Sequence, residues 1–170
     1  LHDHAVHFVG VSDIAEPYRS WRDYKRELTG RDWDYDFRRL FYTWTPDITK
    51  EPFRDWIEIA SRDKTGGWIS PGDLWLGPDG DVHLVWMERA IDERLRKRFF
   101  PDARQSHTLN YARVRAGRIL DRRTLLESSE DKPGLVGSAG RFHVTPDNRL
   151  FVVYLATGTG PDGMPVSENR

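Results

Sequence analysis

The hydrophobic positions of this chain recur in short runs that align with one another without gaps. The runs are AVHFVGV from Ala5, DVHLVWM from Asp81 and RLFVVYL from Arg149. They are rich in β-branched and aromatic residues, which favour strands. Two of them follow another apolar segment across Pro-Asp-Gly from Pro78 or Pro-Asp-Asn from Pro146, the composition of a short hairpin loop. A repeat of this kind predicts a fold made of stacked copies of one unit.

The spacing of the runs defines a unit of four segments. Leu74 and Phe142 in the first segment are 68 residues apart, and so are Val82 and Leu150 in the second. The order of segments along the chain is second to fourth, then first to fourth, then first and second. We therefore predict one domain with three parts, which cover residues 1–62, 63–130 and 131–170.

The predicted strands are joined by turns and loops without helical crossovers, so neighbouring strands should be antiparallel. Runs such as VHLVW from Val82 are apolar on both faces, which indicates sheets that are covered on both sides. The blades of a β-propeller pack in this way. A two-sheet sandwich is the alternative, but it predicts alternating strands without a 68-residue period. We expect an all-β fold of four-stranded antiparallel blades, about two and a half of them, in an incomplete propeller. The end sheets should then expose apolar faces.

Composition narrows the class of protein. Hydrophobic residues make up 38% and charged residues 31%, with a net charge of −1. These values fit a soluble globular chain without a field that attracts nucleic acid or an anionic membrane, so neither partner is predicted. The chain has no cysteine, which excludes disulfides and thiolate metal sites. Its histidines form no HExxH motif, and no metal or other cofactor is predicted.

The connections between strands differ in length at the two ends of the predicted blades. One end carries the short turns. The other carries long loops, over residues 12–39, 62–72, 88–107 and 130–139. Long loops on a rigid scaffold are where binding and catalysis concentrate. We therefore take the long-loop end as the functional face.

The first long loop interleaves aromatic and charged side chains. Sugar rings stack on aromatic faces while their hydroxyls bond polar groups, so we predict substrate binding by Trp21, Arg22, Trp33 and Tyr35. Trp68 in the next loop is a further candidate. The alternative is that Trp21, Tyr24 and Leu28, at helical spacing, pack a short helix onto its blade.

The loop from Glu88 to His107 has its own helical pattern. Ile91, Leu95 and Phe99 are spaced by four residues and predict an amphipathic helix. Its other face carries a basic cluster of Arg94, Arg96, Lys97 and Arg98. This cluster either receives the carboxylate or sulfate groups of an acidic glycan or is an ordinary solvated helix face.

The unit PDGDVHLVW, a loop, LNYARV, a turn and a closing strand resembles the blade of the BNR-repeat, sialidase-like β-propeller superfamily. The superfamily's Asp box would fall at the third turn, where TPDITKEPFRDW from Thr45 keeps an Asp and a Trp at altered spacing. The resemblance implies a five- to seven-bladed propeller, completed by further blades of a longer chain. It also implies carbohydrate chemistry, as an exo-acting glycosidase, a uronic-acid polysaccharide lyase or a glycan-binding module, in an extracellular or periplasmic setting.

The repeat separates packing residues from candidate site residues. His7, His83 and Phe151 share one slot of the unit, and Tyr42 and Tyr111 share another, which favours packing. Polar residues on the long-loop end that do not recur are better catalytic candidates. They are Asp13, Glu88, Arg89 and His107.

Two reaction classes remain open for these residues. A glycoside hydrolase needs two carboxylic groups, for which Asp13 and Glu88 are the candidates. A lyase needs a base near the uronate C5 proton and a cation for its carboxylate. The base would be His107 or Tyr111, and the cation Arg89 or Arg113. The leading function is binding and cleavage of a glycan or polysaccharide at the long-loop end. The alternative is a non-catalytic propeller that acts as a glycan- or protein-interaction module.

Overall fold

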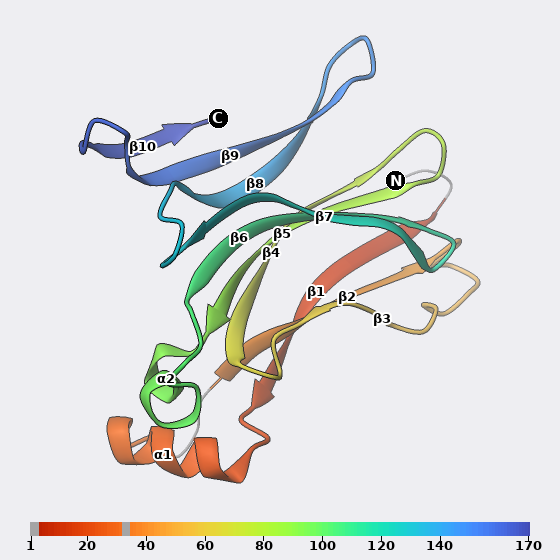
Figure 1. Cartoon of the computed structure of the whole chain (residues 1–170). Helices are drawn as coiled ribbons and strands as arrows, with labels where there is room; N and C mark the ends of the chain where they lie inside the picture. Colours follow the sequence, from red (N-terminus) through yellow and green to blue (C-terminus); the bar gives the residue numbers. More distant parts are fainter. Residues whose placement is uncertain (1–3, 32–34) are drawn as a thin grey trace.

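The computed structural model describes residues 4–31 and 35–170 and consists mainly of antiparallel strands (Figure 1). Sheet I contains β1 (Val6–Ala15), β2 (Tyr35–Thr45) and β3 (Ile57–Ser61). Sheet II contains β4 (Gly66–Leu76), β5 (Val82–Ile91), β6 (Ser106–Arg115) and β7 (Arg118–Ser129). Sheet III contains β8 (Val136–Val144), β9 (Leu150–Thr159) and β10 (Pro165–Asn169). Helix α1 (Arg19–Thr29) joins β1 to β2, and helix α2 (Glu93–Phe99) joins β5 to β6.

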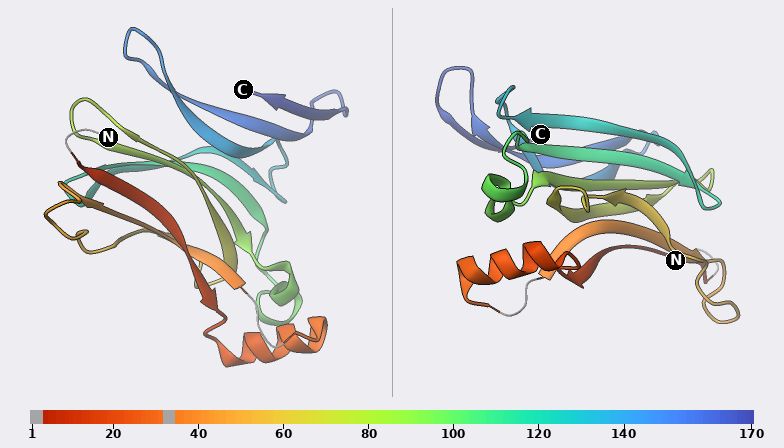
Figure 2. Two further views of the ribbon diagram at one scale, coloured as in Figure 1. Left: turned by 180° about the vertical axis from the view of Figure 1, so that it is seen from behind. Right: turned by 60° about the horizontal axis from the view of Figure 1, so that its bottom comes forward.

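The prediction of antiparallel sheets is confirmed, and each sheet pairs its strands in chain order. The sheets follow one another as successive layers (Figure 2). The described residues form no closed ring of sheets. Strand β10 was not predicted. It pairs antiparallel with β9 along five residues. It begins with a proline, is mostly exposed and has no run of apolar residues, so its composition does not predict a strand.

The tight turns of the repeat share one backbone geometry. Gly80 and Asn148 occupy the same position of the unit, and both have a positive φ, of 81° and 61°. In each turn the same two backbone hydrogen bonds form, from Gly77 and Gly80 in one and from Thr145 and Asn148 in the other. The Pro-Asp-Gly turn before β10 repeats the pattern with Gly163. Left-handed backbone favours glycine and asparagine, which is why these residue types recur there.

The core lies between sheets I and II. Leu40, Tyr42 and Ile59 of sheet I pack against Leu84 and Trp86 of sheet II, and all five are almost fully buried. Alternate residues of β5 therefore face sheet I, and the residues between them face sheet III. Because of this alternation, the side chains of consecutive residues of β5 lie on opposite faces of sheet II.

A histidine–tyrosine pair recurs on equivalent faces of sheets I and II. His7 Nδ1 lies 2.7 Å from the Tyr42 hydroxyl, and His83 Nδ1 lies 2.7 Å from the Tyr111 hydroxyl. Phe142 of sheet III packs against the rings of His83 and Tyr111. In sheets I and II the shared slots are thus packing positions that join one strand to its neighbour, and in sheet II they also contact the next sheet.

Burial lowers the pKa of His83 below its usual 6.5, so we predict that this residue makes stability pH-dependent. The unfolded chain takes up the proton near pH 6.5 and the folded chain does so only at lower pH. The contribution of the neutral His83 to stability is therefore fully present above pH 6.5 and is lost as the pH falls below that value. His83→Phe should flatten this loss between pH 7.5 and pH 5, as measured by urea unfolding. Tyr111→Phe is the control, because it removes the same hydrogen bond but should keep the pH slope. An unchanged slope in His83→Phe would contradict the assignment.

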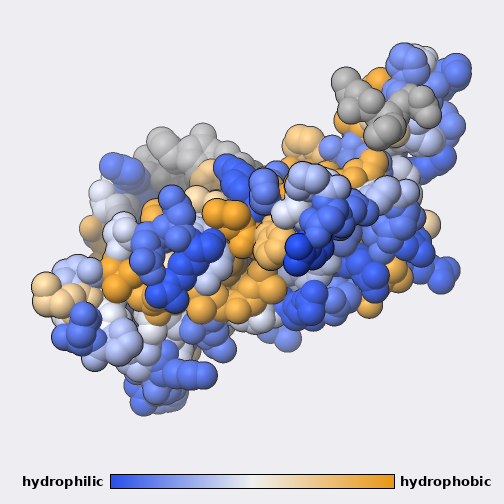
Figure 3. Space-filling model, turned by 90° about the horizontal axis from the view of Figure 1, so that it is seen from above, coloured by the Kyte–Doolittle hydropathy of each residue, from blue (hydrophilic) through white to orange (hydrophobic). Residues whose placement is uncertain are grey.

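The outer faces of the two end sheets are exposed and apolar. On sheet I, Phe8 is 50% and Trp56 56% exposed, and the Trp56 ring contacts Phe8 and Phe41 edge-on. On sheet III, Phe151 is 47% and Val153 41% exposed. Apolar residues also gather among polar ones where the molecule is viewed from above (Figure 3). In sheet II the corresponding faces are covered by sheets I and III.

Helix α1 is the short helix of the packing alternative for Trp21, Tyr24 and Leu28. The helix predicted from Ile91, Leu95 and Phe99 forms as α2, but it begins at Glu93, because Ile91 is the last residue of β5. In α1, Trp21 is buried against Phe99 and Phe100 at the end of α2, whereas Leu28 is exposed. In α2, Leu95 is fully buried, and the Asp92 side chain caps the helix by accepting a hydrogen bond from the Arg94 backbone. Within the described part of the chain, no helix combines the length and apolar character needed to cross a membrane.

Candidate functional site

Both helices lie at the same end of the molecule, away from the short β4–β5 and β8–β9 turns (Figure 1). The β3–β4 and β7–β8 connections reach this end as well, since antiparallel strands return their chain there. This is the long-loop end that the sequence marks as the functional face.

Three predicted site residues lie side by side across sheet II at this end. Trp68 of β4 pairs with Arg89 of β5, and Arg89 pairs with His107 of β6. Directly paired residues of neighbouring strands point to the same face. The three side chains line a cleft of about 190 Å³ that β8 closes on the opposite side with Val136, Gly137 and Ser138. We call it the II–III cleft.

Gly137 allows β8 to approach sheet II closely at this cleft. A Cβ atom at this position would lie 3.1 Å from Leu126 Cδ2 and 3.3 Å from Leu109 Cβ. A larger residue would therefore crowd Leu126 and Leu109.

The charges in the II–III cleft suit an anionic ligand. Arg89 forms no ion pair with any residue that the structure describes, and its Nε is buried without a hydrogen-bond partner. Burial, with the charge of Arg89, lowers the pKa of His107 below its usual value. The cleft thus combines a permanent cation, an imidazole that is neutral at pH 7 and the 37% exposed ring of Trp68.

Glu88 lies beside Arg89 in sequence, but its side chain is on the other face of the sheet. Its carboxylate is buried and accepts hydrogen bonds from Arg62, Arg122 and the Trp86 indole. These partners leave it poorly placed to exchange protons with a ligand in the II–III cleft.

Tyr111 and Arg113 are also placed away from the cleft. Tyr111 is four residues from His107 along β6, which is about 13 Å, and its hydroxyl bonds His83. Arg113 pairs with the buried Asp81, with their charged atoms 3.3 Å apart. The pair of Tyr111 and Arg113 is thus separated from the pair of His107 and Arg89.

The remaining candidates belong to sheet I and its loop. The backbone of Asp13 in β1 pairs with that of Phe37 in β2, and Tyr35 is the first residue of β2. Trp33 lies outside the described residues. Trp21 is buried between the helices, as the packing interpretation predicts, and Arg22 is exposed on α1 away from the II–III cleft.

The basic cluster of α2 is largely neutralised within the chain. Arg94 pairs with Asp92, Arg96 with Glu130 and Arg98 with Glu27. These pairs agree with the interpretation of a solvated helix face and leave the cluster little capacity for a glycan carboxylate.

Sequence reasoning missed a buried ionic network between the helices. Lys25 Nζ lies 3.0 Å from Glu16, 2.9 Å from Asp36 and 3.1 Å from Asp92, and all four side chains are at most 5% exposed. Arg38, fully buried, pairs with Glu16 and Asp36. The signal was Lys25 itself, which stands between Trp21 and Leu28 in a predicted apolar stripe.

The network shifts the pKa values of two of its carboxyl groups in opposite directions. Burial raises the pKa of Asp36, and the nearby Lys25 and Arg38 only partly oppose this. Burial acts on Glu16 as well, but hydrogen bonds from Arg38 and Lys25 bring its pKa below the usual value. The network is enclosed by protein, so we assign it a structural role.

In the part of the chain that the structure describes, no group of three acidic or histidine side chains is arranged to hold a metal ion. Comparison with protein-family models, curated proteins and solved structures gave no match.

Proposed function

We propose that the chain is part of a carbohydrate-active, sialidase-like β-propeller that binds an acidic glycan in the II–III cleft. The observation that carries the proposal is the pairing of Trp68, Arg89 and His107 in one row of sheet II. Trp68 offers an apolar face for a sugar ring, and Arg89 offers donors for a carboxylate. The successive sheets with repeated turns and repeated His–Tyr pairs support the propeller.

Among cleavage reactions, the same site favours a lyase over a hydrolase. With the uronate carboxylate on Arg89, a neutral His107 would take the C5 proton, and a C4–C5 double bond would form as the C4–O bond breaks. The leaving oxygen would keep the electron pair of that bond and take a proton from the protonated His107 or from water. A hydrolase needs two carboxylic groups across the sugar. Glu88, one of the two candidates, has its carboxylate on the opposite face and is held by two arginines.

A non-catalytic module is the second candidate function. Apart from Glu88, the described residues that line the II–III cleft include no carboxylic acid to protonate a leaving group. A site with a cation, an aromatic ring and a single proton-transfer group can bind an acidic glycan without cleaving it.

We further propose that the exposed faces of sheets I and III are covered by more blades of the same kind. In sheet II, the equivalent faces are covered by neighbouring sheets. Burial of Phe8 and Trp56 on one side and Phe151 on the other would remove apolar area from water.

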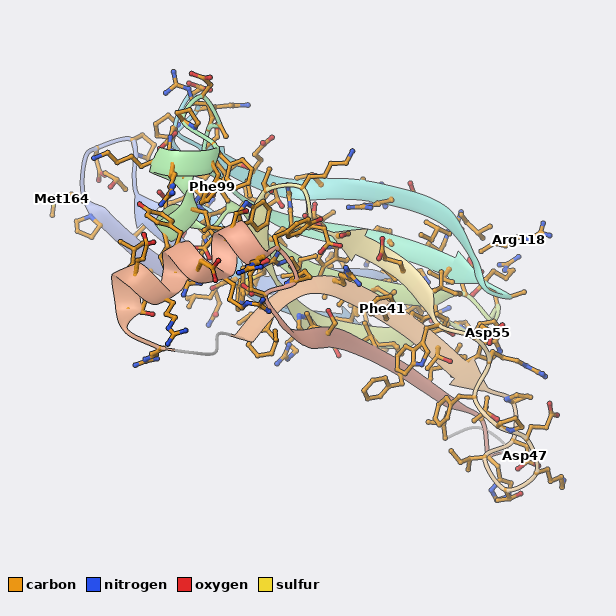
Figure 4. All side chains as sticks on the ribbon, turned by 90° about the horizontal axis from the view of Figure 1, so that it is seen from below. Phe41, Asp47, Asp55, Phe99, Arg118 and Met164 are labelled. Atoms are coloured by element: carbon orange, nitrogen blue, oxygen red, sulfur yellow. The ribbon has the colours of Figure 1, made fainter. Side chains whose placement is uncertain are left out.

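The binding site is tested by Arg89→Met with an oligouronate ligand, measured by calorimetry on the 170-residue chain. Loss of a charge-assisted hydrogen bond worth about 1.5–3 kcal/mol should weaken binding roughly 10- to 100-fold. Arg118→Met is the matched control, since Arg118 lies at the opposite end from Phe99 of α2 (Figure 4). Equal weakening in both variants, or no binding by the unsubstituted chain, would overturn the site.

His107→Asn separates the lyase from the module. The lyase predicts unsaturated uronide, detected by its ultraviolet absorbance, from the unsubstituted chain and none from His107→Asn, with binding retained in both. Binding without product in the unsubstituted chain supports the module.

A further inference from the structure

A second cleft lies on the other face of sheet II, between that sheet and the β3–β4 connection. Strand β3 has 5 residues and β7 has 12, so sheet I leaves the outer part of the facing sheet uncovered. The uncovered space has a volume of about 530 Å³. We call it the I–II cleft. Its lining is almost entirely polar, formed by Arg62, Glu88, Thr108, Asn110, Arg122 and Thr124 with three neighbours.

On the face of β6 toward sheet I, the residues change from apolar to polar where the I–II cleft begins. Ala112 and Val114 are fully buried in the core against sheet I. Asn110 and Thr108 follow on the same face, at 5% and 9% exposure, but are polar. Burying polar groups costs free energy unless they are hydrogen-bonded. Here the Thr124 hydroxyl donates to the side-chain Oδ1 of Asn110 at 3.0 Å, and the side-chain Nδ2 of Asn110 donates to Thr108 Oγ1 at 2.8 Å.

Two arginines converge on one carboxylate at the floor of the cleft. Arg62 and Arg122 both bond Glu88, while their side chains remain 27% and 47% exposed. The lining also contains Arg123 and Glu127, so three arginines face two glutamates and one positive charge is left over. No described residue accepts a hydrogen bond from the terminal NH₂ groups of Arg62. The Arg122 guanidinium lies 5.4 Å above the Trp86 ring, and its Nη1 donates to the Ile59 backbone carbonyl at 2.9 Å, which together fix its place at the cleft wall.

We infer that the I–II cleft is a second binding site, which takes the carboxylate-bearing end of a sugar. The guanidinium groups of Arg62 and Arg122 receive the carboxylate, and the hydroxyl and amide groups of Thr124, Thr108 and Asn110 bond the sugar hydroxyls. The site is independent of the II–III cleft, because Glu88 and Arg89 point to opposite faces of β5. It therefore stands or falls separately from the function proposed above.

The test uses the intact chain, labelled with ¹⁵N, and D-glucuronate, D-glucose and inorganic sulfate as probes. Glucuronate should shift the Trp86 indole and Asn110 amide signals in a saturable way. Glucose should not shift them, and sulfate should bind more weakly. Equal affinity for sulfate and glucuronate overturns the sugar part of the inference, and no shift with either anion overturns all of it.

Two variants assign the binding to its residues. Arg122→Gln should weaken glucuronate binding about tenfold through loss of a charged donor. It should fold, because Arg62 still pairs with Glu88 and the other loss is one hydrogen bond from Arg122 to the Ile59 carbonyl. Thr124→Val should weaken glucuronate binding without affecting sulfate. Arg118→Gln, at the far end, and Arg89→Met, in the II–III cleft, should leave the Trp86 shift unchanged. Loss of that shift in Arg89→Met alone would assign the binding to the other cleft.

Discussion

Lys25→Met is expected to destabilise the folded chain by about 3–5 kcal/mol, the cost of removing one partner of a buried ion pair. Methionine preserves the length of the side chain but leaves Glu16, Asp36 and Asp92 without the ammonium group that lies about 3 Å from each. Arg38 and Arg94 remain as partners, but the three buried carboxylates then share one cation fewer and repel one another more strongly in a medium of low polarity. Urea unfolding at pH 7 measures the difference.

The matched control for Lys25 is Arg22→Met on the same helix. Arg22 is exposed, so its replacement should change the free energy of unfolding by no more than about 0.5 kcal/mol. Similar losses for the two variants would show that helix α1 as a whole, rather than the network, is sensitive.

The loss caused by Lys25→Met should diminish as pH falls from 7 to 5. Without the ammonium group, the folded chain binds protons on its buried carboxylates more tightly than the unfolded chain does. Stability then rises as pH falls through the raised pKa values. Asp36, whose pKa is already raised by burial, should take up a proton first.

Trp86→Ala is the second change with a large expected effect, a loss of about 3–5 kcal/mol in the free energy of unfolding. The ring is fully buried between sheets I and II, so truncation leaves a cavity in the core. The indole also donates to Glu88 at 2.6 Å, and Arg122 lies over its face. Urea unfolding again provides the measurement.

Two controls separate the contributions of Trp86. Trp86→Phe retains most of the apolar contact but not the indole donor, so its loss should be clearly smaller. Trp56→Ala removes a tryptophan that is 56% exposed on the outer face of sheet I and should cost only about 0.5–1.5 kcal/mol of aromatic contact. A loss in Trp56→Ala as large as in Trp86→Ala would contradict the placement of the core.

The repeat predicted the sheets because each strand pair carries its own local signals. The Pro-Asp turns at Gly80 and Asn148 and the apolar runs beside them are contiguous in sequence. Strand β10 escaped prediction because its pairing depends on β9 rather than on its own composition. The antiparallel sheets were therefore predictable, and a polar edge strand was not.

The candidate site was predictable residue by residue but not as an arrangement. Trp68, Arg89 and His107 meet only because of the pairing of β4, β5 and β6, which involves an irregularity near Pro71. The opposite orientation of Glu88 follows from strand alternation and could have been anticipated. The buried network around Lys25 depends on the contact between α1 and α2, so no local pattern reveals its partners.

The unlike faces of the three sheets give the stack a direction. The face of sheet I that carries His7 meets sheet II, and the face of sheet II that carries His83 meets sheet III. Phe151 marks the equivalent face of sheet III, whereas Phe8 marks the opposite face of sheet I. The stack of sheets therefore has two ends that are not equivalent. Any sheet that extends it must join head to tail, and turning such a sheet over would bring two faces of the same kind together.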